Sequence, residues 1–529
     1  MNKSISAVWV IILLGMFCYC TNSEPALPPS GLSGDQLATK YCGSCHEYTP
    51  PHLLTKTIWR DDVLPAMGHH LGIYPDGIRP DSLLTQSGNP EVVINAGIFP
   101  DNPLLASEDW EKIVDYYTTQ APEHLIQPTE NNSIIPKLAH FTYRESDYSR
   151  RPSLTTMVKI LPEQNGLVFA DSKPGINKLI FLDQDLTMRS ELNFKTAPIQ
   201  FDERLDTLLI TTIGTNPFPS DRTDGDFQMV YKTGNSQIYN GSSIILPDLK
   251  RPVHVAYGDL DQDGQEDIVV SEFGHLTGQV SWYRNTGDGH YKKNVLKNAP
   301  GSIRAEITDL NKDGYTDVVV LMSQGREGIY YFQNNGPGTN PTENNITFSE
   351  KQLLSFSPLH GSQYFEMHDF NGDGYDDILY VCGDNADKTP ILKEYHGLYI
   401  FLNDGHSNFT QAWFYRQNGA YKAVAGDFDL DGDLDIASIS FFPDYVDHPQ
   451  ESFIYLENTG DLQFIPQSFP QASKGRWMVM DAGDLDQDGD LDIALGSFVY
   501  FTPMGDTTGL GQRWMEEGPS VILLENTIK

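Results

Sequence analysis

Cysteine is scarce in this chain: five cysteines occur in 529 residues, and only Cys42, Cys45 and Cys382 follow residue 20. Exported proteins that depend on disulfides carry more cysteines than this. We therefore expect packing and bound metal, not a disulfide framework, to stabilise the protein. Cys382 lies in an apolar run and is expected to be a buried strand thiol.

Positive charge is equally scarce. The sequence has 36 Lys and Arg residues against 72 Asp and Glu residues, a formal net charge of −36. Nucleic-acid binding needs clustered Lys and Arg, and this surface would repel a polyanion. The composition therefore excludes nucleic acid as a partner.

Long apolar runs are missing after the N-terminus, so no later segment is expected to cross a membrane. At the start, a basic tip precedes an apolar stretch from Ala7 to Phe17 that is typical of a secretory signal. Cys18 and Cys20 close this stretch, where a lipoprotein signal places its acylated cysteine. We predict a signal over residues 1–20 with lipid attachment at Cys20, and a plain cleaved signal is the alternative.

This reading places the protein outside the cytoplasm. Residues 21–32 would form a polar tether, and the membrane would be reached only through the lipid anchor. The expected location is the periplasm, the outer membrane or the cell surface.

Cys42, Cys45 and His46 form a C-x-x-C-H motif after a stretch with helical spacing. Two thiols and an imidazole on one helical face can form two thioether links to a porphyrin and ligate its iron. A zinc site would need a second Cys pair, which the sequence lacks. A redox dithiol would need a βαβ context, which is also missing. The motif predicts one covalent haem c.

Met67 is the only methionine between His46 and residue 122, and it is the leading candidate for the sixth iron ligand. Histidines lie nearby at positions 52, 69 and 70, so a histidine ligand, or none, stays open. Further along, apolar residues at helical spacing predict a helix from Ser107 to about Thr119. Residues 33–122 resemble a class I cytochrome c domain, which implies a small all-α fold. Residues 123–137 are expected to be a linker.

An acidic loop of the form D-x-[DN]-x-D-G-x-x-D occurs five times and is followed each time by an apolar run typical of a strand. The loops begin at residues 259, 309, 369, 427 and 484, which are 50, 60, 58 and 57 residues apart. Repeats of this length are typical of stacked or radially arranged units. After each loop comes an aromatic or aliphatic strand that ends in Asn, and we expect this strand to close each unit.

The loops place carboxylate or amide oxygens at alternate positions around a glycine, which suits Ca²⁺. An EF-hand would need Glu at position 12, which none of the five loops has. We expect about five Ca²⁺ ions with a structural role, and position 7 of each loop would contribute its backbone carbonyl. The predicted ligands are Asp259, Asp261, Asp263, Gln265 and Asp267; Asp309, Asn311, Asp313, Tyr315 and Asp317; Asp369, Asn371, Asp373, Tyr375 and Asp377; Asp427, Asp429, Asp431, Asp433 and Asp435; and Asp484, Asp486, Asp488, Asp490 and Asp492.

Two further units lie upstream, around residues 158–169 and 199–210, where strand patterns persist without acidic ligands. Two degenerate and five acidic units make a seven-bladed all-β propeller over residues 138–529. The block resembles the FG-GAP or VCBS repeat family of integrin-like propellers.

Together these features predict an exported haem c electron-transfer protein with a calcium-stabilised propeller that binds a partner protein or a glycan. A redox partner protein is expected, and no catalytic residue is proposed because no convincing nucleophile or base is found. Two alternatives stay open: an oxidoreductase acting on a sugar or alcohol with the cytochrome as electron outlet, and an adhesion or recognition protein.

Overall fold

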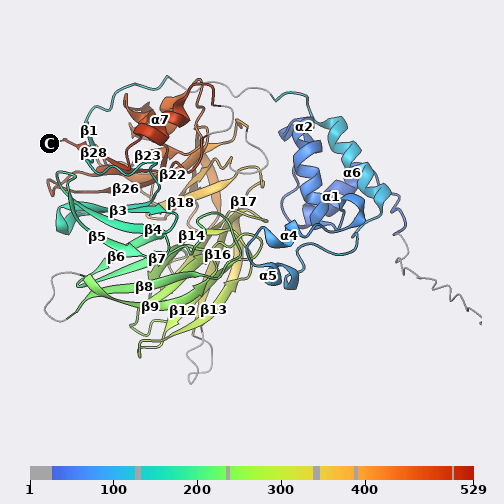
Figure 1. The fold of residues 1–529 in the computed structure, drawn as a ribbon, viewed down its shortest axis with the longest axis horizontal. Helices are drawn as coiled ribbons and strands as arrows, with labels where there is room; N and C mark the ends of the chain where they lie inside the picture. The colour runs from blue at the N-terminus through green and yellow to red at the C-terminus, as the bar shows by residue number, and fades with distance from the viewer. Residues whose placement is uncertain are drawn as a thin grey trace, which may run out of the picture.

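The computed structural model shows a small helical domain beside a large ring of β-sheets (Figure 1). It describes residues 27–125, 133–233, 239–337, 346–385, 391–502 and 506–528. The expected signal and Cys20 lie outside the described residues. Within the described residues, no helix is long and apolar enough to cross a membrane.

The helical domain is built from short helices around one apolar core. Its α-helices are α1 (Gly34–Tyr41), α2 (Lys56–Ile58), α3 (Leu64–His70), α4 (Ser82–Thr85), α5 (Pro90–Asn95) and α6 (Ser107–Gln120). Four single turns, η1 (Cys42–Ser44), η2 (Pro51–Leu53), η3 (Trp59–Val63) and η4 (Pro75–Gly77), connect them. The helix expected from Ser107 is confirmed as α6.

Helices α1 and α6 pack closely because Gly34 has no side chain. A Cβ at this position would lie 2.4 Å from the carbonyl oxygen of Lys112 and 2.7 Å from the Cβ of Tyr116. Leu37, Ile113 and Tyr117 are buried between the helices. A larger residue at position 34 would force the helices apart.

The ring consists of seven four-stranded antiparallel sheets, which confirms the seven-bladed propeller. Blades 1 to 3 are β2–β5 (Thr155–Leu161, Gly166–Lys173, Ile176–Asp183, Met188–Phe194), β6–β9 (Pro198–Arg204, Thr207–Thr212, Gly225–Lys232, Tyr239–Leu249) and β10–β13 (Pro252–Gly258, Asp267–Glu272, Gln279–Asn285, Tyr291–Lys297). Blades 4 to 6 are β14–β17 (Ser302–Thr308, Asp317–Met322, Gly328–Pro337, Ile346–Ser355), β18–β21 (Ser362–His368, Asp377–Cys382, Gly397–Asn403, Phe409–Arg416) and β22–β25 (Ala420–Gly426, Asp435–Ser440, Phe453–Asn458, Phe464–Gln467).

Blade 7 combines strands from both ends of the ring. Its order is β26 (Trp477–Gly483), β27 (Asp492–Ser497), β28 (Val521–Asn526) and β1 (Phe141–Glu145). A short helix, α7 (Leu510–Glu517), lies between β27 and β28. Because β1 precedes all other strands of the ring, its antiparallel pairing with β28 closes the circle.

The second strand of each acidic blade is buried along its whole length, because neighbouring blades cover both of its faces. This explains the continuous apolar runs such as Ile268-Val269-Val270. Seven of the apolar clusters each join residues of two adjacent blades. Cys382, in β19, is fully buried in one of them, as expected.

One expectation about the blade was wrong. The strand that ends in Asn is the third of its blade, and a fourth strand, such as β13 after Asn285, follows it. The fourth strands lie at the outer edge and are largely solvent-exposed and polar. They therefore lack the apolar pattern that marks the inner strands.

The propeller has two different faces because its strands alternate in direction. The five acidic loops join first to second strands and lie on one face, here called the acidic face. Loops between second and third strands, and the connections between blades, lie on the opposite face.

The helical domain contacts this second face, here called the helical-domain face. Arg326 Nη2 donates to the carbonyl of Ser44 at 3.2 Å, Ser355 Oγ donates to Glu47 at 2.9 Å, and the backbone of Asp221 donates to that of Ser87 at 2.8 Å.

Candidate functional site

The C-x-x-C-H motif lies where α1 ends and the turn η1 begins. Cys42 is partly buried and Cys45 is exposed, and both thiols are free. Ser44 Oγ donates to the carbonyl of Tyr41 at 2.7 Å, which holds the turn compact. The two thiols and the imidazole of His46 are therefore presented within one turn of chain.

The imidazole of His46 has a defined tautomer. Its Nδ1 lies 2.8 Å from the carbonyl oxygen of Glu47. A carbonyl oxygen can only accept, so Nδ1 carries the hydrogen and Nε2 keeps its lone pair. This is the form in which a histidine binds a metal, with its other nitrogen oriented by a hydrogen bond.

Cys42 is not an activated thiol. Burial raises its pKa to about 11, although Tyr117 acts against this through a side-chain hydrogen bond. A redox-active dithiol needs a lowered pKa so that the thiolate forms near neutral pH. The environment of Cys42 therefore disfavours the redox-dithiol alternative.

Met67 and His70 project from neighbouring positions of α3, one turn apart. The ring of His70 lies 4.8 Å from that of Phe99. Its pKa is lowered by burial and, to a smaller extent, by the nearby imidazoles of His69 and His46. Both Met67 and His70 stay open as candidates for the sixth ligand.

The five acidic loops share one backbone conformation. The carboxylate at position 1 accepts hydrogen bonds from backbone N–H groups within its loop. Asp259 accepts from Asp263 at 3.0 Å and from Gly264 at 2.8 Å. The glycine at position 6 has a positive φ in every loop, 82° at Gly264, which explains why only glycine occurs there.

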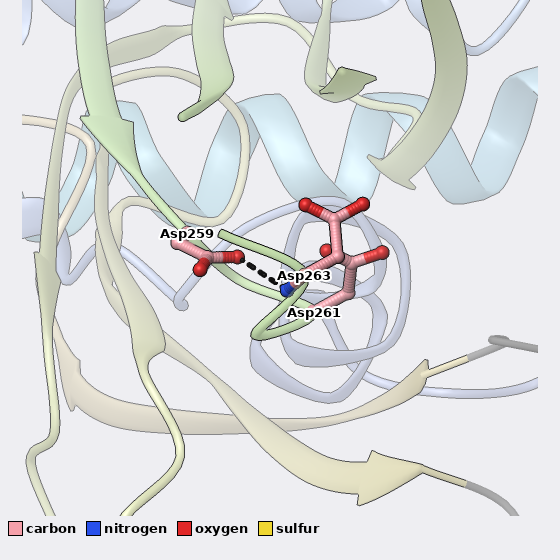
Figure 2. A group of neighbouring side chains, drawn as sticks. All are labelled: Asp259, Asp261 and Asp263. Carbon is pink, nitrogen blue, oxygen red and sulfur yellow. Dashed lines mark hydrogen bonds between the residues drawn. The ribbon is translucent and has the colours of Figure 1, made fainter. Parts of the chain in front are cut away.

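Figure 2 shows the first loop, with the carboxylates of Asp259, Asp261 and Asp263 close together. In each of three loops, three carboxylates offer oxygen atoms within 4.8 Å of one another. The first residues of these loops are Asp259, Asp427 and Asp484. The other two loops have Asn311 and Asn371 at the third position, so they carry one carboxylate fewer among positions 1, 3 and 5.

Several of these carboxylates are buried without a partner. Oδ1 of Asp261, Asp427 and Asp433, and both oxygens of Asp490, have no hydrogen bond within the described part of the chain. Burial, followed by repulsion from Asp488, raises the pKa of Asp490 to about 6. A bound cation would satisfy these oxygens and relieve the repulsion, so the donor set fits a hard metal ion.

The carboxylate at position 9 connects the loop to the third strand, a role that the sequence analysis missed. Asp317 is fully buried; one oxygen accepts from Asn334 N at 2.7 Å, and the other from Tyr331 Oη at 2.8 Å and Leu310 N at 3.2 Å. The equivalent Asp and Asn pair occurs in all five acidic blades. The sequence did carry a signal for this contact, because the position-9 Asp and the Asn at the end of the third strand both recur in each acidic repeat.

The loops differ in the charge of the residue that precedes the Asn at the end of the third strand. In blade 3, Arg284 of β12 forms ion pairs with Asp261 and, at 3.4 Å, with Asp263. In blade 6 the equivalent residue is Glu457. The pKa of Asp429 in this loop is raised mainly by burial and then by the charge of Asp431, and the charge of Glu457 raises it further. The first loop is therefore partly neutralised from within, and the fourth is not.

A cavity of about 910 Å³ occupies the centre of the ring and reaches the loops of the helical-domain face. The first strands of all seven blades line it, and no residue of the helical domain does. Glu327 lines this cavity, and the adjacent Arg326 donates to Ser44 of the C-x-x-C-H motif. The motif and the cavity therefore share one face of the molecule.

Comparison with protein families gives one match. The FG-GAP-like repeat family matches residues 309–380 and 369–438, which span blades 4 to 6 from the second acidic loop onward. The propeller carries FG-GAP-like repeats. Such a propeller indicates a binding or recognition role.

Comparison with solved structures gives propeller-length matches at low identity. A virginiamycin B lyase from Staphylococcus aureus is 12% identical, with 73% of this chain and 100% of that chain covered and a TM-score of 0.43. A lectin from Agrocybe aegerita that recognises non-reducing terminal N-acetylglucosamine is 15% identical, with 68% and 95% covered and a TM-score of 0.36. These values are too low to carry information about ligand or activity. No curated protein sequence matches the chain significantly.

Proposed function

We propose that this protein transfers electrons through a haem c bound at Cys42, Cys45 and His46, and that its FG-GAP-like propeller, stabilised by calcium, binds a partner protein or a glycan. The observation that carries the proposal is the hydrogen bond between His46 Nδ1 and Glu47, which leaves the lone pair of Nε2 available, in the same motif as two thiols that form no disulfide. A haem bound here would supply one-electron transfer.

The helical domain would hold the group through the residues already described. Cys42 and Cys45 would provide the two thioether links, and His46 would ligate the iron. Met67 is the first candidate for a further iron ligand, and His70 is the alternative on the same helix face. The exposed position of Cys45 leaves this edge of the domain accessible to a redox partner protein.

Calcium is the proposed occupant of the acidic loops. The carboxylates at positions 1, 3 and 5 converge, and buried oxygens lack partners. The position-9 oxygen that accepts from the Asn N–H accepts only that one hydrogen bond, so it keeps a second lone pair. The role of calcium is structural, because each loop joins two strands of a blade and the five loops are spread around the ring.

Export and lipid attachment at Cys20 belong to the same proposal. They rest on the basic tip and the apolar stretch from Ala7 to Phe17. The test is incorporation of labelled fatty acid into the protein, with Cys20→Ser and Cys18→Ser as a matched pair. Labelling that persists in Cys20→Ser would contradict attachment at Cys20.

The haem assignment is tested by expressing the protein in a host that assembles c-type cytochromes. The intact protein is expected to show haem that survives denaturing electrophoresis, and the Cys42→Ala/Cys45→Ala double variant should lose it. Cys382→Ala is the matched control, because this buried thiol lies in the propeller. Covalent haem in the double variant, or none in the intact protein, would contradict the proposal.

Calcium is tested by thermal unfolding with and without a chelator. A ligand that binds only the native state stabilises it by about 2.7 kcal/mol per site at 100 times its Kd. The midpoint of propeller unfolding should therefore fall in excess chelator and recover when Ca²⁺ is restored. An unchanged transition would argue against bound calcium.

One observation favours an oxidoreductase as a second candidate. The central cavity is lined by Glu327, next to Arg326, which contacts Ser44 of the C-x-x-C-H motif. Addition of sugars or alcohols to the haem-loaded protein separates the two functions, because only the oxidoreductase would show reduced haem bands. A glycan bound without any spectral change would favour pure recognition.

A further inference from the structure

The end of the central cavity at the helical-domain face, here called its mouth, combines aromatic rings with Arg251, and Arg476 lies behind these rings. Phe218, Phe273, Tyr421, Phe441, Phe442 and Phe501 line the cavity on the helical-domain face. Arg251 lines it as well, and its guanidinium lies 4.9 Å from the centre of the Phe273 ring. Apolar rings with a few charged groups are the usual lining of small-molecule sites.

Arg251 has hydrogen-bonding capacity to spare. Its Nη2 donates to the carbonyl of Pro217 at 3.0 Å, and its Nε is buried with no partner among the described residues. No carboxylate forms an ion pair with it within the described part of the chain. Its backbone φ is 46°, a conformation that costs energy in a residue other than glycine and that is often found at binding sites.

Arg476 places a second positive charge behind this wall, against Phe441 and Phe501, which line the cavity. It is 2% exposed, and its guanidinium lies 3.8 Å from the centre of the Phe441 ring. It donates to the carbonyls of Phe441 at 3.1 Å and Phe501 at 3.2 Å, and no carboxylate pairs with it in the described residues. A buried arginine is ordinarily matched by an anion.

The acidic residues around the cavity mostly have donors of their own. Glu327 accepts from Ser362 N and Oγ, Glu366 from Tyr364 Oη and Ala425 N, and Asp481 from Lys159 and Ile160 N. Asp384 also lies near the mouth.

Tyr421 lies among the charged groups of the mouth. Burial and, next, Asp384 raise its pKa to about 12, while Arg251 and Arg476 act in the opposite direction. Its hydroxyl is therefore protonated at neutral pH and can donate a hydrogen bond.

From this arrangement we infer that the mouth of the central cavity binds a small organic anion with an apolar or aromatic body. The anionic group meets Arg251 and the hydroxyl of Tyr421, and the body packs against Phe273 and Phe441. Arg476 acts as a positioning residue that holds these rings and adds positive potential. The site goes beyond the proposed electron transfer and does not depend on haem.

The test compares 1-naphthoate with 1-naphthamide, which has nearly the same shape without the charge. Titration calorimetry on the full chain with calcium present should show one site that binds naphthoate at least about tenfold more tightly, as expected for a charge-assisted hydrogen bond. Phenyl phosphate in place of naphthoate distinguishes a phosphate ligand from a carboxylate ligand. Equal affinity for naphthoate and naphthamide would overturn the inference. The absence of saturable binding for both naphthoate and phenyl phosphate would also overturn it.

Variants identify the residues. Arg251→Gln should reduce naphthoate affinity about tenfold and leave naphthamide binding unchanged, and Arg251→Lys should lose less. Arg189→Gln is the matched control, because Arg189 also donates to a backbone carbonyl, that of Gln164 at 2.8 Å, but lies away from the cavity. Naphthoate affinity that is the same in Arg251→Gln and Arg189→Gln would overturn the assignment. The Cys42→Ala/Cys45→Ala variant should bind naphthoate normally, which separates this site from the haem proposal.

Discussion

Blades 1 and 2 differ from blades 3 to 7 in the connection between the first two strands. Residues 162–165 make this connection in blade 1 and residues 205–206 in blade 2, whereas residues 259–266 make it in blade 3. All seven blades nevertheless have four antiparallel strands. A blade therefore forms with a turn of two residues, and the longer acidic loop is not needed to make the sheet.

The comparison separates two roles of the acidic loops. Their position-9 aspartate is part of the blade itself, since it ties the loop to the third strand. Their first carboxylates point at one another with unsatisfied oxygens, an arrangement that costs energy without a cation. Blades 1 and 2 avoid this cost, so each experiment below contrasts the two kinds of blade.

The largest effect is expected at position 9. Asp317→Ala would leave three buried donors, on Leu310, Tyr331 and Asn334, without their acceptor. Each costs about 1–3 kcal/mol, so we expect a loss of about 3–9 kcal/mol in the free energy of unfolding. Urea titration measures this. Asp206→Ala in blade 2, whose side chain is 88% exposed, is the control and should change it by less than about 0.5 kcal/mol. Similar losses in both variants would remove the distinction.

A smaller effect is expected on acidification. Burial lowers the pKa of His360 to about 4, and it also lowers the pKa values of His254, His275 and His396. The folded protein keeps these imidazoles neutral, while the unfolded chain takes up protons below about pH 6.5. The contribution of these histidines to stability should therefore fall as the pH decreases from about 6.5 to 4, whereas carboxyls with a raised pKa such as Asp490 act in the opposite direction.

This acid sensitivity is expected only in blades 3 to 7, because residues 155–249, which form blades 1 and 2, contain no histidine. In His360→Gln, the loss of unfolding free energy between pH 7 and pH 4 should be about 1–3 kcal/mol smaller than in the parent protein. Urea titrations at the two pH values measure it. Hydrogen exchange should locate the early opening in blades 3 and 5. The same pH dependence in variant and parent would contradict the assignment to His360.

The smallest effect is expected at two glycines. Gly264 of the first acidic loop and Gly175 of blade 1 have φ values of 82° and 76°, and a Cβ would meet nothing within 4 Å at either. Alanine should therefore cost about 1–2 kcal/mol at both positions through backbone strain alone. Only Gly264→Ala should also weaken Ca²⁺ binding, measured by calorimetry. Weaker calcium binding in Gly175→Ala as well would mean that the effect is not local to the loop.

Much of the ring could be predicted from the sequence because its signals are local. Each acidic loop carries its ligands within nine residues, and the apolar run that follows is buried on both faces. The degenerate blades were found by period alone. The fourth strands were missed because they lie at the outer edge, where polar residues are tolerated.

Other features could not be predicted because they depend on residues far apart in the sequence. Strand β1 precedes the first acidic loop by more than 100 residues, and nothing in Phe141–Glu145 indicates that its partner is β28. The mouth of the central cavity is likewise assembled from several blades, so neither Arg251 nor Arg476 stands out along the chain. The C-x-x-C-H motif was recognisable, but the hydrogen bond that fixes the tautomer of His46 required coordinates.

The closure of blade 7 has a consequence for biosynthesis. The helical domain is complete once residue 125 has left the ribosome, whereas β1 must wait for β28, almost 400 residues later, before it can pair. During that interval β1 has no strand partner and the face of blade 1 that packs on blade 7 is uncovered, and both invite association with other chains. The N-terminal domain can thus fold well before β1 and β28 close the ring, and ring closure is the step with the greater risk of misassembly.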